Sequence, residues 1–224
     1  MTTETEFKQM KWAGLSFLGL GLMGTPMAQV LHAAGLPLQV WNRDSSKSQR
    51  LQQQGLRVLS DLTALAGAPQ IVISMLADGA AVLEVAQLAL PHLAAGSIWI
   101  DMSSTSPAEA QQLQRLCLAS QVSFADAPVS GGVGAAQQAK LAIMVGAEAG
   151  VFAQIEAILS VMGRVTRVGE VGCGQLAKLC NQLIVGGTIS IVNELPIEDY
   201  LMAILTPSFS DETPPEALDR KSVV

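Results

Sequence analysis

Short runs of hydrophobic residues alternate with longer segments of mixed polarity through the first two thirds of the chain. The runs predicted to be β-strands are residues 15–18, 38–41, 56–59, 71–74, 97–100 and 122–125. Strands that are buried on both faces of a parallel sheet read as continuous apolar runs of this kind. The pattern therefore predicts a sheet that is covered by helices on both sides.

The segment between the first two strands has the period of an amphipathic helix. Met27, Val30, Leu31 and Ala34 fall at spacings i, i+3, i+4 and i+7, and Gly35 follows as a stop signal. A helix between two buried strands predicts a βαβ unit. The chain is therefore assigned to the α/β class, as a Rossmann-type, doubly wound and mainly parallel sheet.

Other helix starts are marked by capping residues. Asp61, Asp78 and Ser106 stand at N-cap positions, and Pro107 stands where the first turn of a helix tolerates a missing N–H. After Ala127 the pattern changes to a glycine-rich turn. The elements expected after this turn are a strand at 141–145, a helix near 151–159, a strand near 164–168 and a long helix at 171–194.

These patterns divide the chain into an N-terminal extension (1–13), an α/β domain (14–170), the long helix (171–194) and a tail (195–224). The tail holds four of the ten prolines and six acidic against two basic residues. Such a composition predicts disorder.

Composition and charge exclude several classes of partner. The chain has 13 basic and 19 acidic residues, a net charge of −6 and a pI of about 4.9, so it repels nucleic acid. Its mean hydropathy is +0.38, but the longest candidate for a membrane span, residues 179–193, falls short of the ~20 consecutive apolar residues that a span requires. Residues 1–11 do not have the pattern of a signal peptide, and we expect a cytoplasmic protein. The three cysteines form no CxxC pair, so we expect neither a disulfide framework nor a metal site.

A glycine motif follows the first predicted strand and opens the first predicted helix. The loop reads GxGxxG, and we expect all of its residues to contact a cofactor: Gly19, Leu20, Gly21, Leu22, Met23 and Gly24. Glycines here permit a tight turn, a close approach to a pyrophosphate and close helix packing. The alternative is a glycine-rich turn without a ligand, but the flanking strand and helix favour dinucleotide binding.

The end of the second strand predicts which dinucleotide is bound. NAD enzymes usually place an acidic residue here, whereas this strand is followed by Asn42 and Arg43, with Lys47 four residues later. We expect all three to contact the cofactor, with Arg43 and Lys47 holding a 2′-phosphate, so NADP (NADPH) is predicted over NAD. Asp44 is the feature that opposes this interpretation, and a solvated Arg and Lys at a helix start is the alternative.

Two further motifs could hold a substrate. Ser130, Gly131 and Gly132 follow the sixth strand, where their backbone N–H groups could form a nest for a carboxylate or simply a tight turn. Farther along, one face of the long helix carries Gly174, Lys178 and Asn181, which stand at positions i, i+4 and i+7. Gly174 is interpreted as leaving space for a ligand beside Lys178. A desolvated Lys178 could donate a proton, and a surface lysine is the alternative.

Together these motifs resemble the β-hydroxyacid dehydrogenase family, which includes 3-hydroxyisobutyrate dehydrogenases and semialdehyde reductases. The resemblance is carried by residues 17–28, the DAPVSGG stretch from Asp126, and residues 172–181, with two further loops at 75–79 and 101–107. It implies an NADP-dependent oxidoreductase that interconverts a small 3-hydroxy acid and its semialdehyde.

The resemblance also implies roles for individual residues. Lys178 would be the proton donor and acceptor, and Asn181 would orient the substrate, whose carboxylate would be held by residues 130–132. Leu76 and Ala77 would contact the cofactor through their backbone, and Ser104 would lie near the nicotinamide ribose. In the family the long helix leads into an all-helical domain of roughly a hundred residues, which forms much of a homo-oligomer interface.

Residues 195–224 are too few and too rich in proline to be that domain, so the sequence predicts a C-terminally truncated member in which oligomerisation is not expected. A cofactor-binding module without catalytic activity is therefore the alternative function. An imine reductase has a similar fold but usually another residue at the lysine position, so Lys178 argues against it.

Overall fold

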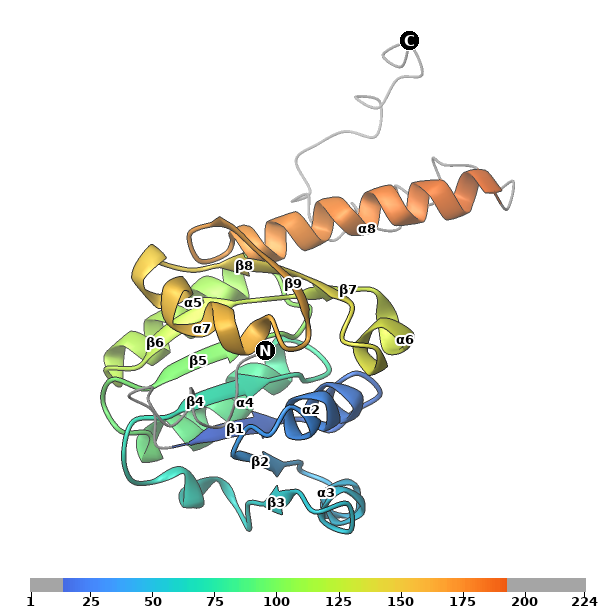
Figure 1. Ribbon diagram of the computed structural model, residues 1–224. Helices are drawn as coiled ribbons and strands as arrows, with labels where there is room; N and C mark the ends of the chain where they lie inside the picture. The colour runs from blue at the N-terminus through green and yellow to red at the C-terminus, as the bar shows by residue number, and fades with distance from the viewer. Residues whose placement is uncertain (1–13, 193–224) are drawn as a thin grey trace. The chain divides into compact units, whose positions relative to one another are not determined.

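The computed structural model describes residues 14–192, and its side chains through residue 186 (Figure 1). The predicted extension (1–13) and tail (195–224) lie outside the described residues, as do the last two residues of the predicted long helix. The chain divides into two compact units whose boundary falls inside the last helix, after Lys178.

The first unit is built on a nine-stranded sheet. Its strands are β1 (Leu15–Leu18), β2 (Leu38–Trp41), β3 (Arg57–Val58), β4 (Ile71–Ser74), β5 (Ile98–Asp101), β6 (Ser123–Asp126), β7 (Val129–Ser130), β8 (Leu141–Gly146) and β9 (Gly163–Gly169). The spatial order is β3-β2-β1-β4-β5-β6-β8-β7, with β9 paired to β8. The first six strands are parallel, and β8 joins β6 and β7 in antiparallel orientation. The predicted doubly wound, mainly parallel sheet is confirmed.

Helices connect the strands, as the sequence predicts. They are α2 (Gly24–Ala33), α3 (Ser45–Gln52), α4 (Gly79–Ala89), α5 (Pro107–Ala119), α6 (Gly132–Gln137), α7 (Ala149–Leu159) and α8 (Cys173–Val192), with two short 3₁₀ turns, η1 (Leu62–Leu65) and η2 (Leu90–His92). The N-caps predicted at Asp61, Asp78 and Ser106 are confirmed, and Ser106 forms a full capping box with Glu109.

The strands send alternate side chains to two hydrophobic clusters, one on each face of the sheet. In β4, for example, Ile71 and Ile73 join the cluster that includes residues of α2 and α7, whereas Val72 joins the cluster that includes residues of α4 and α5. All three side chains are fully buried. Burial on both faces is the physical reason that these strands read as continuous apolar runs.

Several details differ from the expectation. Strand β3 covers only two residues of the predicted 56–59, and β8 ends one residue later than predicted. Strands β5 and β6 each begin and end one residue later than predicted. Each ends on a buried aspartate, Asp101 or Asp126, which a search for apolar runs leaves out. The predicted glycine-rich turn contains β7 and α6, which are too short to show a hydrophobic period. The long helix begins at Cys173 instead of residue 171.

The second unit is described only over residues 179–192, which form the rest of α8. Leu179, Ile184 and Val185 are exposed there. No helix within residues 14–192 has the length and apolar character needed to cross a bilayer.

Candidate functional site: a dinucleotide pocket and an anchored lysine helix

The glycine loop that follows β1 is shaped by close contacts at its two ends. Gly19 has a φ of +102°, and a Cβ atom there would lie 2.2 Å from the carbonyl oxygen of Met75. A Cβ at Gly24 would lie 2.0 Å from the carbonyl oxygen of Gly19. At Gly21, in contrast, a Cβ would meet no atom within 4 Å. The outer glycines therefore close the turn, and the middle one leaves its backbone open to a ligand.

Asn42 holds this loop from the neighbouring strand. Its Oδ1 accepts the backbone N–H of Leu20 at 2.8 Å, and its Nδ2 donates to the carbonyl oxygen of Asp44 at 3.0 Å. The Leu20 side chain is buried in the core beneath the loop. Asn42 thus ties the glycine loop to the residues after β2, and its side-chain amide is already engaged within the protein.

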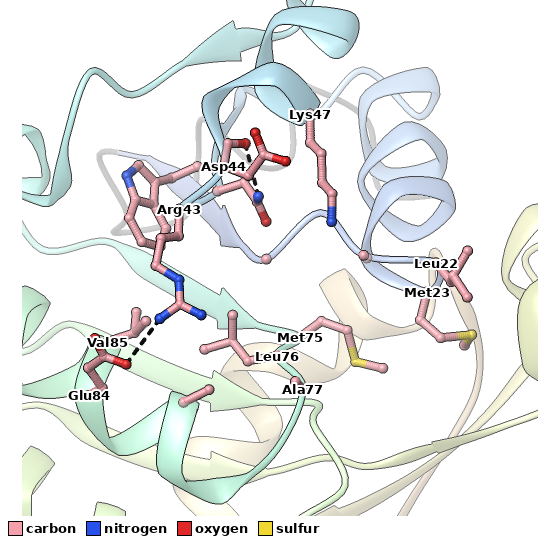
Figure 2. A pocket seen from close by; sticks show the side chains of 16 residues that line it. Leu22, Met23, Arg43, Asp44, Lys47, Met75, Leu76, Ala77, Glu84 and Val85 are labelled. Atoms are coloured by element: carbon pink, nitrogen blue, oxygen red, sulfur yellow. Dashed lines mark hydrogen bonds and ion pairs between the residues drawn. The ribbon is translucent and has the colours of Figure 1, made fainter.

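A pocket of about 430 Å³ lies in front of the loop (Figure 2). Its lining comes from the glycine loop, the end of β2, the start of α3, the loop after β4 and α4: Gly19, Gly21, Leu22, Met23, Gly24, Trp41, Asn42, Arg43, Asp44, Lys47, Met75, Leu76, Ala77, Ala81, Glu84 and Val85. Of the residues expected to contact a cofactor, only Leu20 and Ser104 are not in this lining.

Positively and negatively charged side chains both line the pocket near the end of β2. The guanidinium of Arg43 forms an ion pair with Glu84 across the pocket, with Nη1 and Oε2 separated by 3.3 Å (Figure 2). Asp44 caps α3, because its Oδ1 accepts both the N–H and the hydroxyl of Ser46. These hydrogen bonds hold the pKa of Asp44 below its usual value. The carboxylate that opposed the NADP interpretation is therefore engaged by its own helix.

The loops after β4 and β5 are joined by Ser103, a residue that the sequence analysis did not select. Its hydroxyl accepts the N–H of Leu76 at 2.9 Å and donates to Oδ1 of Asp101 at 2.6 Å. Ser74 donates to the same oxygen at 2.8 Å. The N–H of Leu76 is thus occupied, so a backbone contact from Leu76 to a cofactor would have to use its carbonyl group. Ser104, which was expected to lie near the nicotinamide ribose, is exposed.

Burial of Asp101 shifts its acidity. The loss of solvent raises the pKa of Asp101 to about 6, although hydrogen bonds from Ser103 and Ser74 act in the opposite direction, and the nearby Asp126 raises it further. Oδ1 of Asp101 accepts three hydrogen bonds, one from the hydroxyl of Ser74 at the end of β4 and two from the N–H and the hydroxyl of Ser103.

The start of α8 is anchored to the sheet by Asp126. Oδ1 of Asp126 accepts the N–H of Gly172 at 2.7 Å, and Oδ2 accepts the N–H of Gln175 at 2.8 Å. A carboxylate at a helix N-terminus satisfies free N–H groups and interacts favourably with the helix dipole. Burial nevertheless raises the pKa of Asp126, since desolvation is the largest influence on it.

The structure corrects the interpretation that Gly174 leaves space for a ligand. A Cβ at this position would lie 2.6 Å from Oδ2 of Asp126 and 2.6 Å from the carbonyl oxygen of Met144. The missing side chain therefore lets α8 approach β6 and β8 closely. It does not provide space for a ligand beside Lys178.

Gln175 connects α8 to the loop after β5. Its buried side chain accepts the N–H of Thr105 at 3.1 Å and donates to the carbonyl oxygen of Ser103 at 2.8 Å. Lys178 follows on the next turn, is half-buried, and has its pKa lowered by desolvation. The lysine therefore stands on a helix whose first turn is fixed at the carboxyl ends of β5 and β6.

The remaining predicted substrate residues lie outside the dinucleotide pocket. Ser130 ends β7, and Gly131 and Gly132 follow with φ values of +128° and +67° at the start of α6. Both values are accessible mainly to glycine. Asn181 lies on the part of α8 that belongs to the second unit.

Comparisons with known proteins agree with this geometry. A family model described as the NAD binding domain of 6-phosphogluconate dehydrogenase matches residues 14–174. The mitochondrial 3-hydroxyisobutyrate dehydrogenase of Homo sapiens is 35% identical over 187 residues, which cover 80% of this chain and 56% of that protein. The 2-(hydroxymethyl)glutarate dehydrogenase of Eubacterium barkeri is 32% identical over 184 residues, covering 80% and 61%.

A solved structure shows the same fold. The 3-hydroxyisobutyrate dehydrogenase of Mycobacterium tuberculosis, determined with L-serine, superposes with a TM-score of 0.75 at 26% identity, covering 93% of this chain and 74% of that chain. The present chain spans 56% of the human relative's length. These matches confirm the resemblance to the β-hydroxyacid dehydrogenases, and the chain belongs to the family of the NAD binding domain of 6-phosphogluconate dehydrogenase.

Proposed function

We propose that this chain is part of an NADP-dependent oxidoreductase that interconverts a small 3-hydroxy acid and its semialdehyde. The observation that carries the proposal is the desolvated Lys178, on a helix that Asp126 and Gln175 fix beside the loop after β5. The dehydrogenases to which the chain is similar support the reaction class.

The pocket fits a dinucleotide. Gly21 leaves open space where a pyrophosphate would approach the backbone. Helix α2 begins three residues later, at Gly24, so the N-terminus of a helix follows this turn. Arg43 and Lys47 supply the positive charge that a 2′-phosphate requires, and the carboxylate of Asp44 is engaged by Ser46. NADPH is therefore the proposed cofactor, in preference to NADH.

In the proposed mechanism the bound cofactor supplies a hydride to the carbonyl carbon of the semialdehyde. Lys178, as its ammonium form, donates a proton from Nζ to the oxygen, which becomes the hydroxyl group. In the oxidation direction the neutral amine accepts that proton. Desolvation lowers the pKa of Lys178 from that of an ordinary lysine, so the neutral amine forms more readily than it would on a fully solvated lysine.

Substrate binding is assigned to two further groups. We propose that Ser130, Gly131 and Gly132 bind the carboxylate of the substrate, since successive backbone N–H groups of a turn can converge on an anion and Gly131 and Gly132 form such a turn with positive φ values. Asn181 is proposed to orient the substrate. A cytoplasmic location stays a prediction, with the mitochondrial human relative as the counter-example.

The test is NADPH oxidation by the purified chain with tartronate semialdehyde, succinic semialdehyde, glyoxylate and methylmalonate semialdehyde. Turnover is expected with at least one of them. Lys178→Met should abolish turnover while NADPH binding is retained, and Lys140→Met, which removes an exposed lysine outside the pocket, should change neither.

A second function is favoured by the family match, which describes an NAD binding domain and covers residues 14–174. It is a cofactor-binding module without turnover. NADPH binding by the wild type without oxidation in the presence of any aldehyde would favour this module over the enzyme.

A further inference from the structure

Glu84 is an acidic residue of the pocket lining. Its carboxylate faces Arg43, one of the two basic residues predicted to hold the 2′-phosphate of NADP. Asp44, the other acidic residue of the lining, is engaged by Ser46 at the start of α3. Glu84 instead extends from α4 toward Arg43, with 3.3 Å between Oε2 and Nη1 (Figure 2). The pair connects two elements that are 41 positions apart in the sequence and meet at the pocket.

The ion pair is exposed and therefore easily broken. The side chains of Arg43 and Glu84 are 77% and 57% exposed. Ion pairs of this kind contribute about 0 to 1 kcal/mol, because solvent screens them and both side chains lose rotamer freedom. A ligand that offers Arg43 a stronger anion can displace Glu84 at a small cost.

A 2′-phosphate is such an anion. It carries a charge of about −1.5 to −2 at neutral pH and offers several acceptor oxygens, whereas Glu84 carries a single charge. The pair with Glu84 engages Nη1 of Arg43 and offsets the positive charge of its guanidinium, so a phosphate that binds Arg43 competes with Glu84 for both. A dinucleotide without the 2′-phosphate makes no such demand on Arg43.

We propose that Glu84 is a specificity-determining residue, which competes with the 2′-phosphate of the cofactor for Arg43 and so limits the preference for NADP over NAD. The inference rests on the proposed NADP site and adds a residue that opposes it. Arg43 and Lys47 set the direction of the preference, and Glu84 sets how large it is.

The experiment measures the phosphate site alone. Adenosine 2′,5′-bisphosphate and adenosine 5′-monophosphate are titrated into the wild-type chain and into Glu84→Gln at low salt, by calorimetry. Glu84→Gln should bind the bisphosphate roughly two- to fivefold more tightly, which is the range expected for an exposed ion pair. Its affinity for the monophosphate should be unchanged.

Two further variants separate the proposed competition from other effects. In an Arg43→Gln background, the Glu84→Gln change should no longer tighten the bisphosphate, because the competition acts through the guanidinium. Glu156→Gln removes an equally negative, exposed side chain from α7, outside the pocket, and should leave both affinities unchanged.

Several results would overturn the inference. An unchanged bisphosphate affinity in Glu84→Gln would show that no competition exists. An equal gain for both nucleotides, or a full gain in the Arg43→Gln background, would show general repulsion in place of competition for Arg43. Binding of NADPH by the wild type in these cases would leave the proposed cofactor site standing, whereas a wild type that binds neither NADPH nor the bisphosphate would overturn both.

Discussion

Oδ2 of Asp126 accepts a hydrogen bond from the backbone N–H of Gln175 over a distance of 2.8 Å. Through this bond, a residue at the end of a central strand supplies the cap that the local sequence of α8 lacks, since Gly172 precedes the helix without a side chain. The position of Lys178 therefore depends on a contact formed across the fold.

Replacement of Asp126 should destabilise the first unit. Asp126→Ala removes both acceptors and leaves the N–H groups of Gly172 and Gln175 without partners, so we expect the free energy of unfolding to fall by about 3 kcal/mol. Urea unfolding measures the loss. Asp126→Asn keeps one acceptor and should lose less than the alanine variant, and equal stabilities of all three proteins would contradict the capping role.

A methyl group at Gly174 should also be costly. Gly174→Ala would place a Cβ 2.6 Å from Asp126 Oδ2 and from the carbonyl oxygen of Met144. Such overpacking costs about 1 to 3 kcal/mol. Gly150→Ala is the matched control, because Gly150 lies in α7, where a Cβ would meet no atom within 4 Å. This control should gain up to about 1 kcal/mol from helix propensity, and thermal unfolding of both variants distinguishes the two effects.

Gly21 and Gly24 should respond differently to the same substitution. Gly24→Ala meets the carbonyl oxygen of Gly19 and should lower the free energy of unfolding by about 2 kcal/mol or more. Gly21→Ala meets no protein atom, so its stability should be unchanged while its methyl group enters the pocket and weakens NADPH about tenfold or more. Stability by thermal unfolding and affinity by NADPH fluorescence give the two readouts. Unaltered NADPH binding by Gly21→Ala would argue against a pyrophosphate at this turn.

The buried Asp101 predicts a specific pH dependence of stability. Its pKa is raised from 3.8 to about 6 in the folded state. Between these values the folded chain binds more protons than the unfolded chain, so this residue's contribution to stability is largest below pH 4 and is lost as the pH rises through 6. The difference amounts to about 3 kcal/mol.

Asp101→Asn should remove this pH-dependent contribution to the free energy of unfolding, while the Oδ1 of the asparagine still accepts hydrogen bonds from Ser103 and Ser74. The measurement is the free energy of unfolding by urea at a series of pH values between 4 and 7. Asp61→Asn is the control, because hydrogen bonds from Thr63 lower the pKa of the exposed Asp61 from 3.8. The contribution of Asp61 is therefore lost only below that value, and the profile of this variant between pH 4 and 7 should run parallel to that of the wild type. Parallel pH profiles for wild type and Asp101→Asn would refute the assignment.

The features that could be predicted from the sequence are those that depend on neighbouring residues. The glycine loop, with its preceding strand and following helix, is contained in a short segment, and each glycine has a local reason. The caps at Asp61, Asp78 and Ser106 bond to N–H groups within three positions of themselves. Local chemistry of this kind can be recognised without knowing the fold.

The features that escaped prediction join distant segments. Asp126 bonds to a residue 46 positions later, and Gln175 bonds to one 72 positions earlier. The role of Gly174 was misjudged for the same reason, because the atoms that exclude a side chain there come from β6 and β8. Ser103 gave no signal either, as nothing near it in the sequence reveals that its hydroxyl reaches Leu76.

Asn42 has a consequence for attempts to redesign the cofactor preference. Its position directly before Arg43 makes it an obvious target for mutagenesis, yet its amide spans the glycine loop and the residues after β2. Randomising positions 42 to 47 together would disturb the support of the glycine loop along with the charge of the pocket. Libraries that keep Asn42 and vary positions 43, 47 and 84 would change the charge of the pocket while preserving its frame.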